Sequence, residues 1–383
     1  MSRTGFVLAA VLAAAFSSTV QAKEPLKLGA VYGLTKAISF LGIPEERALR
    51  MRVDQINAAG GIDGRPIELK IYDTEGDGTK AVQQFRRLIE SDQVHVVFGP
   101  SSSGESLLVA DAAEEAGVPT ILHAGTERVV VPPKKFVFNT PPSDRIAISH
   151  MLSYFKTHGI HSVAMLSSAD GFGQSGKSML RELADAYGIK IAVEQEFDRQ
   201  DPDMTVAVLK ARESNADATL IWSAPPAPAV ILRSAKNLGY DKPIFTGYGA
   251  ASDSLITTAG SDAAEGVYVS SLRLLAPESL PESDPSKKTV DELVSAYKKI
   301  YNEKPQPGAQ HSYDAMLILE PAVAKLNDEK LSRAAIRDAI EKVSVVGTNG
   351  QFRFSAERHG GLDAESGSFV MLRWLDGRWR IAE

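Results

Sequence analysis

The chain has 383 residues, 44% of them hydrophobic, and a formal net charge of -6 at pH 7. This length is too great for one ordinary domain and suits two domains of about 150–200 residues each. The negative charge gives no electrostatic reason to expect nucleic acid or an anionic membrane surface as a partner. The sequence contains no cysteine, so we expect large hydrophobic cores rather than disulfides to stabilise the protein.

The first 22 residues predict export from the cytoplasm. Arg3 precedes an apolar run over 6–16, and Val20-Gln21-Ala22 supplies the small residues that a signal peptidase requires. The apolar run is shorter than the about 20 residues that a membrane-spanning helix needs. We therefore expect a signal peptide cleaved after Ala22 and a soluble mature protein in a bacterial periplasm, where ATP-driven chemistry is not expected.

From Leu26 onward, short apolar runs alternate with amphipathic segments. Before Pro141-Pro142 the pattern predicts, in order, strand 26–31, helix 43–58, strand 67–72, helix 79–90, strand 94–98, helix 103–116 and strand 119–122. After it come helix 145–157, strand 162–166, helix 174–187, strand 189–194, helix 204–214, strand 218–222, helix 227–238 and strand 243–246. Two such series of similar length predict an α/β fold with two doubly wound parallel sheets.

The last hundred residues predict a different arrangement. Helices are expected at 289–301, 312–326 and 332–343, followed by strands at 369–374 and 378–381. Asp376-Gly377 lies between these strands, and this pair tolerates the positive φ that a tight hairpin turn needs. The chain should therefore end in an antiparallel pair of strands.

Three predicted strands end in loops rich in small and hydroxyl residues. The loops are Gly99–Gly104, His123–Thr126 and Ser167–Gly173. Ligands of open α/β sheets bind beyond the carboxyl ends of the strands. Hydroxyl and amide donors at a helix N-terminus suit an anion, in particular a carboxylate. Ser101–Ser103 could also be ordinary helix caps, although three consecutive serines exceed what one cap needs.

Other motifs carry less weight. Gly171–Ser178 matches the phosphate-loop pattern, but export, the lack of a clear acid for magnesium and the preceding Asp170 argue against a nucleotide site. His158 and His161 lack a third metal ligand in register, and no nucleophile elbow is present. We therefore expect no enzyme activity, no cofactor and no metal.

Five segments, in this order, resemble the type I periplasmic solute-binding proteins of the leucine/isoleucine/valine-binding family: Ile56–Gly64, Gly99–Ser103, Gly117–Pro119, Asp170–Gly173 and Gly260–Gly266. The resemblance implies two lobes, 23–142 plus 273–345 and 143–272 plus 346–383, with crossings near Pro142, Leu272 and Val346. It also implies a monomer that closes on a small ligand by hinge motion. The partner would be an ABC permease in the inner membrane, or alternatively a membrane sensor.

The same resemblance implies a binding site. Ser103 and Thr126 would hold a ligand carboxylate together with nearby backbone amides, with Ser102 and Gly125 also at the site. Ala124 would supply a backbone carbonyl to the ligand. The ligand body would lie against Phe172, Trp222, Ser223, Tyr248, Phe40 and Leu41.

One part of the family pattern is missing. Amino-acid binders place an acid after the strand equivalent to 244–246, to pair with the ligand ammonium, whereas this chain has Gly247–Ala251 there and no acid before Asp253. A buried ammonium without its counter-charge loses several kcal/mol. Tyr248 instead suits an aromatic acid of the benzoate or hydroxycinnamate type. A branched-chain or other aliphatic amino acid stays the alternative, with Asp253, Asp170 or another acid as the ammonium partner.

Overall fold

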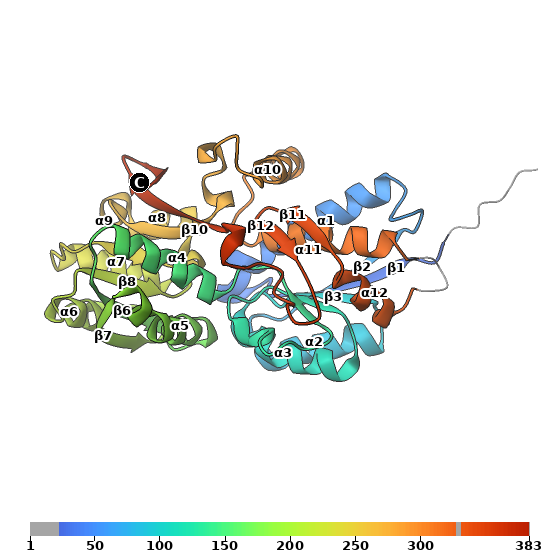
Figure 1. Cartoon of the computed structure of the whole chain (residues 1–383), viewed down its shortest axis with the longest axis horizontal. Coiled ribbons are helices and arrows are strands. Elements are labelled where there is room, and N and C mark those ends of the chain that lie inside the picture. Colours follow the sequence, from blue (N-terminus) through green and yellow to red (C-terminus); the bar gives the residue numbers. More distant parts are fainter. Residues whose placement is uncertain (1–22, 327–330, 383) are drawn as a thin grey trace, which may run out of the picture.

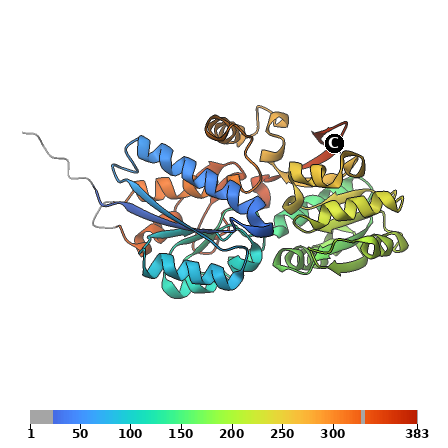
Figure 2. The same cartoon turned by 180° about the vertical axis from the view of Figure 1, so that it is seen from behind.

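A computed structural model describes residues 23–326 and 331–382, so the expected signal peptide and its cleavage site lie outside the described residues. Two α/β lobes lie side by side, and the chain ends in the second of them (Figures 1 and 2). The fold predicted from the sequence, two lobes with doubly wound parallel sheets, is confirmed.

The first lobe contains a parallel sheet with the strand order β2-β1-β3-β4-β5. Its strands are β1 (Leu26–Tyr32), β2 (Ile67–Asp73), β3 (Val96–Phe98), β4 (Thr120–Leu122) and β5 (Val137–Asn139). Helices α1 (Ser39–Ala58), α11 (Ala309–Ala324) and α12 (Arg333–Ile340) pack on one face, while α2 (Gly78–Glu90) and α3 (Ser103–Ala116) cover the other. Because both faces are covered, the inner strands β3 and β4 are buried along their whole length and mostly apolar.

The second lobe has the strand order β14-β13-β10-β9-β8-β6-β7. Its strands are β6 (Ser162–Ser168), β7 (Lys190–Phe197), β8 (Ala218–Trp222), β9 (Ile244–Thr246), β10 (Tyr268–Leu272), β13 (Phe369–Leu375) and β14 (Arg378–Ile381). One face carries α4 (Asp144–Thr157) and α5 (Gly171–Tyr187), and the other carries α6 (Thr205–Glu213) and α7 (Ala227–Asn237). The short helices α8 (Asp253–Ala259) and α9 (Ser261–Ala264) lie beside α7. The predicted hairpin is present, with φ of 50° at Asp376 and 78° at Gly377.

The predicted elements are present in the predicted order, with shifted ends. Helix α5 begins at Gly171 rather than Gln174, because the Asp170 side chain accepts a hydrogen bond from the Gly173 amide. Strands β5 and β10 and the hairpin of β11 (Ser344–Gly347) and β12 (Gly350–Arg353) were not expected. These segments are short, with three to five residues each, and lack a clear alternating pattern.

The hairpin of β11 and β12 changes one lobe boundary. Phe352, Phe354 and Leu362 lie in the same core cluster as β1 and α11, whereas Phe369 packs in the core of the second lobe. The chain therefore returns to the second lobe between Leu362 and Phe369, and the expected crossing near Val346 is too early. Helix α10 (Lys287–Tyr301), in the segment after β10, packs against α1.

Candidate functional site

Both sheets share one feature that positions a ligand site. The first lobe has the order β2-β1-β3-β4-β5, and the second repeats it as β7-β6-β8-β9-β10. In such sheets the ligand crevice lies where the strand order reverses, here beyond β1 and β3 in one lobe and beyond β6 and β8 in the other. A cavity of about 930 Å³ is lined by the segments that follow these strands in both lobes.

Two helix N-termini meet at this cavity. Ser102 caps α3 by accepting a hydrogen bond of 3.3 Å from the Glu105 amide, and Asp170 caps α5. A Cβ atom at Gly171 would lie 3.3 Å from the Gly104 Cα, so the first turns of the two helices are in contact across the lobes. The positive ends of both helix dipoles therefore face the same space.

Ser103 offers a hydrogen-bond donor to the cavity. Its Oγ accepts hydrogen bonds from the amides of Gly125 (3.1 Å) and Thr126 (3.3 Å). A hydroxyl that accepts two bonds still has its own proton to donate. Ser103 is buried and lines the cavity, so this proton can point to an acceptor on a ligand.

The structure brings seven of the predicted site residues to the cavity wall: Phe40, Leu41, Ser102, Ser103, Gly125, Phe172 and Tyr248. Four others are not among the residues that line the cavity, and each has its polar group bonded elsewhere or its side chain buried. The Ala124 carbonyl accepts from Asn139 Nδ2 (2.8 Å), and the Thr126 hydroxyl accepts from the Arg128 amide (3.4 Å). Ser223 Oγ donates to the Ala224 carbonyl (3.1 Å). The fourth, Trp222, is fully buried.

An aromatic cluster forms the wall on the side of the second lobe. Phe172 stacks on Trp222 with a centroid distance of 5.5 Å, and Tyr248 meets Phe172 edge-on at 5.5 Å. Two glycines leave room for these rings: a Cβ at Gly125 would lie 2.0 Å from Tyr248 Oη, and one at Gly249 would lie 2.5 Å from Phe172 Cε1. Trp222 thus supports the wall without reaching the cavity.

A buried carboxyl group holds Tyr248 in place. The Tyr248 hydroxyl donates to Asp144 Oδ1 at 2.8 Å, and Asp144 is fully buried at the start of α4. Burial raises the pKa of Asp144 to about 7 and the pKa of Tyr248 well above its ordinary value. The tyrosine hydroxyl is therefore engaged, and the residue presents its ring to the cavity.

The cations at the cavity wall are already paired. Lys36 lies 2.7 Å from Glu75, Arg47 lies 2.9 Å from Glu303, and Arg199 lies 3.5 Å from Asp170. Among the described lining residues no other lysine or arginine occurs. Attraction of an anion therefore depends on the helix N-termini and on hydroxyl donors.

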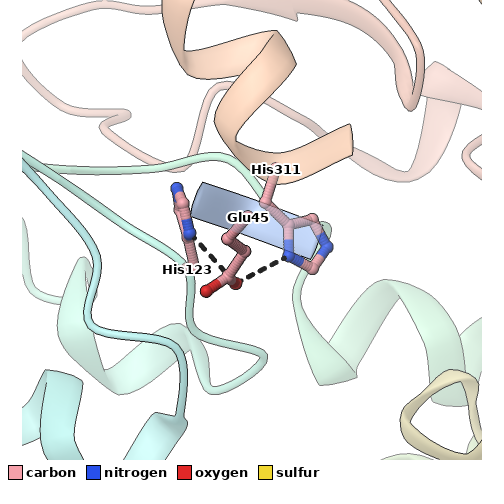
Figure 3. Close-up of side chains that lie close together, drawn as sticks. All are labelled: Glu45, His123 and His311. Atoms are coloured by element: carbon pink, nitrogen blue, oxygen red, sulfur yellow. Dashed lines mark ion pairs between the residues drawn. The ribbon is translucent and has the colours of Figure 1, made fainter. Parts of the chain in front are cut away.

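A buried cluster that was not predicted from the sequence lies beside the cavity. Glu45 of α1 lies 3.1 Å from His123 Nδ1 and 3.6 Å from His311 Nδ1 of α11 (Figure 3). Burial acts to raise the pKa of Glu45, but the two imidazoles outweigh it and lower the pKa, while burial lowers that of His311. A signal was present in the sequence: Glu45 precedes the apolar Ala48 and Leu49 by three and four residues, which places a charge on the buried face of the helix.

The phosphate-loop pattern has a packing explanation. Gly171–Ser178 lies within α5, and a Cβ at Gly176 would lie 2.2 Å from Trp222. A Cβ at Gly173 would lie 1.9 Å from the Ser168 carbonyl oxygen, and Lys177 pairs with Glu196 at 2.6 Å. The glycines thus permit close packing of the helix on the sheet.

Comparisons with known proteins agree with this architecture. Residues 25–370 match the family model described as periplasmic binding protein. A Leu/Ile/Val-binding protein homolog of Brucella suis is 25% identical over 386 residues, covering 97% of this chain and 94% of its own. The crystal structure of an extracellular ligand-binding receptor from Rhodopseudomonas palustris HaA2 is 29% identical, with a TM-score of 0.84 and coverage of 94% of this chain and 100% of that chain.

A more distant structure has the same fold. The branched-chain amino acid transporter substrate-binding protein of Streptococcus pneumoniae, in complex with isoleucine, is 23% identical, with a TM-score of 0.80 and coverage of 94% of this chain and 99% of that chain. In the part of the chain that the structure describes, no helix has the length and apolar character needed to cross a bilayer. With the family model matching nearly the whole chain and two lobes enclosing a cavity, the protein belongs to the periplasmic binding protein family.

Proposed function

We propose that this protein is the solute receptor of an ABC importer and binds a small carboxylate with an aromatic body in the cavity between its lobes. The observation that carries the proposal is the meeting of the α3 and α5 N-termini at the cavity, beside the Ser103 hydroxyl. Helix N-termini and hydroxyl donors stabilise a carboxylate. Because the ligand contacts both lobes, its binding favours the closed form of the protein. A permease can then recognise this closed form.

The aromatic cluster supports a flat, apolar ligand body. Phe172 and Tyr248 both line the cavity, at right angles to each other, and Trp222 supports them from behind. Edge and face contacts of this kind contribute about 0.5–1.5 kcal/mol per ring pair beyond the buried area. A benzoate or hydroxycinnamate would place its ring against these side chains and its carboxylate against the helix ends.

An amino acid is the second candidate, and two observations favour it. Curated relatives are named as Leu/Ile/Val-binding protein homologs. Glu105 also lines the cavity: it accepts a hydrogen bond from Ser102 Oγ (2.6 Å) and another from Thr74, and no cation pairs with it among the described residues. Glu105 is therefore the acid available to a ligand ammonium, at a place in the sequence different from the family position.

The ligand is tested by calorimetry and thermal melting of the purified protein with benzoate, 4-hydroxycinnamate, leucine and the 2-oxo analogue of leucine. A ligand at about 100 times its Kd adds about 2.7 kcal/mol to the free energy of unfolding, which raises Tm visibly. Binding of an aromatic acid but not of leucine supports the proposal. If only leucine binds, the proposal of an aromatic ligand is wrong. If none of the four compounds binds, the proposal of a carboxylate ligand is wrong.

Two variants separate the candidates. Tyr248→Ala should weaken an aromatic acid at least tenfold, whereas Glu105→Gln should leave it nearly unchanged. For an amino acid the order reverses, because the loss of the carboxylate removes the partner of the ammonium. Circular dichroism of each variant checks that it is folded. The importer role is tested separately by uptake of the radiolabelled ligand in cells that lack the protein.

A further inference from the structure

Glu45, His123 and His311 come from three separate parts of the first lobe. Glu45 lies on α1, His123 follows β4, and His311 lies on the first turn of α11. Their exposed fractions are 0%, 3% and 8%. One candidate ligand atom from each residue lies within 4.8 Å of those of the others. A carboxylate and two imidazoles so close together need a common partner or compensating hydrogen bonds.

Most polar atoms of these side chains lack such hydrogen bonds. Glu45 Oε1 and both ring nitrogens of each histidine are buried and have no hydrogen-bond partner among the described residues. The distances of 3.1 Å and 3.6 Å to Glu45 Oε1 are short, but the rings are not oriented for hydrogen bonds to that oxygen. Five polar atoms of one buried cluster are thus left without hydrogen-bond partners, although Glu45 Oε1 lies within ion-pair distance of both imidazoles.

We propose that Glu45, His123 and His311 form a binding site for one divalent transition-metal ion of the Zn²⁺ type. Two imidazole nitrogens and one carboxylate oxygen are a ligand set that such ions prefer. With metal–ligand bonds of about 2.1 Å, the two observed distances correspond to angles of roughly 95° and roughly 120° at the metal, which bracket the tetrahedral angle. The third pair, the two imidazole nitrogens, lies within 4.8 Å and would have to come within about 4.2 Å for both to bind the same ion.

Surrounding groups orient the ligands, as the outer shell of a metal site does. Ser101 Oγ donates to Glu45 Oε2 and accepts from the Gly33 amide at 3.2 Å, which leaves Oε1 directed to the histidines. Tyr32 stacks on the His123 ring at a centroid distance of 5.6 Å, and its hydroxyl is bonded to Ser312 Oγ. The His123 ring and the carboxylate are therefore held by neighbours other than the proposed ion.

The fourth coordination position would face the ligand cavity, because His123 and His311 both line it. Three protein ligands and one open position are the usual arrangement when a metal ion binds an exchangeable group. Resting on the proposed function, that position would take one oxygen of the ligand carboxylate. Glu45 and a carboxylate ligand would together neutralise the two positive charges of the ion, so the buried site would carry no net charge.

The metal site is tested without any organic ligand. Protein without a polyhistidine tag is treated with a chelator, dialysed, and titrated with Co²⁺ and Zn²⁺ by calorimetry, with Mg²⁺ as the control for an ion that prefers oxygen ligands. The expected result is one Co²⁺ per chain, with the intense visible bands of a tetrahedral Co²⁺ site and no response to Mg²⁺. Absence of these bands, or binding equally strong for Mg²⁺, overturns the proposal.

Variants locate the ion. His311→Ala should weaken Co²⁺ binding at least tenfold, whereas His150→Ala should not, because His150 lies in the second lobe and contacts Ser270. Unchanged Co²⁺ binding in a folded His311→Ala variant overturns the site. If that variant unfolds, the spectrum of the wild-type protein still decides. Carboxylate binding measured with and without Zn²⁺ is a separate result, so failure of the metal site is distinguishable from failure of the proposed function.

Discussion

At the scale of single residues, the pair of Asp144 and Tyr248 connects ligand binding to stability. Burial raises the pKa of Asp144 to about 7, against an unfolded value near 3.9. Between these values the folded protein binds more protons than the unfolded chain. The free energy of unfolding must therefore fall as pH rises from about 4 to about 7, and the cost of burying the ionised carboxylate is fully present above that range.

The variant Asp144→Asn should lose this part of the pH dependence, because its amide does not titrate. We expect it to gain stability relative to the wild type by up to a few kcal/mol between pH 5 and pH 8. Urea unfolding at both pH values measures the effect, and Asp262→Asn, at an exposed position, is the matched control. Parallel pH curves for Asp144→Asn and the wild type would contradict the prediction.

At the scale of elements, the contact between the first turns of α3 and α5 is the point where the lobes meet around the ligand. A Cβ atom added at Gly171 would lie 3.3 Å from the backbone of Gly104. A larger side chain at Gly171 would hold the two helices apart. It would leave the core of each lobe intact, because the contact lies at the cavity wall and not in a core cluster.

Gly171→Val should therefore weaken ligand binding at least tenfold while changing the Tm of the ligand-free protein by only a few degrees. Gly104→Ala is the control in the same contact, since a Cβ there meets nothing within 4 Å. Calorimetry with the ligand found in the screen gives the affinities, and melting curves give the stabilities. Equal affinities for the two variants would show that the contact does not control closure.

The elements themselves could be predicted from the sequence because their pattern is local. Apolar residues at helical spacing and buried runs of four to eight residues identified most of the helices and parallel strands, but not the short helices α8 and α9. The positions of Ser103, Phe172 and Tyr248 at the cavity follow in turn, because the carboxyl ends of parallel strands share one edge of each sheet. Short strands such as β5 were missed because three residues carry no period.

Other features depend on contacts between segments far apart in the chain. Glu45, His123 and His311 are separated by 78 and 188 residues, so no spacing rule could bring them together. Trp222 and Thr126 were expected at the cavity but lie behind it, because the burial of a side chain depends on what packs on it. The boundary near Val346 was wrong for the same reason: Phe352 belongs to the core cluster that contains residues of β1 and α11.

At the scale of the whole molecule, an ion pair with little exposure connects two of the chain segments that cross between the lobes. Arg273, directly after β10, donates to both carboxylate oxygens of Asp284 (3.0 and 2.8 Å) and to the carbonyl of Gly367 (2.8 Å), which precedes β13. The side chains of the pair are only 5% and 11% exposed. The relative placement of these passages thus depends on one guanidinium group.

Arg273→Ala should lower the free energy of unfolding by about 3–5 kcal/mol, because it leaves Asp284 without its partner in a buried position. Lys288→Ala breaks an exposed pair of 3.9 Å and should cost less than about 0.5 kcal/mol. Urea unfolding of both variants makes the comparison. A loss below about 1 kcal/mol for Arg273→Ala would mean that solvent replaces the pair.

Each lobe is built from segments that are far apart in the sequence, and this affects when the protein can fold. Strand β10 needs β13 as its neighbour, close to the C-terminus, and the core around β1 needs α11 and Phe352. Neither lobe can complete its core until the last third of the chain has been synthesised, and pairings over such long separations form slowly. While most of the chain is being made, neither lobe has a complete core, and this is the state in which an unfolded chain can be exported.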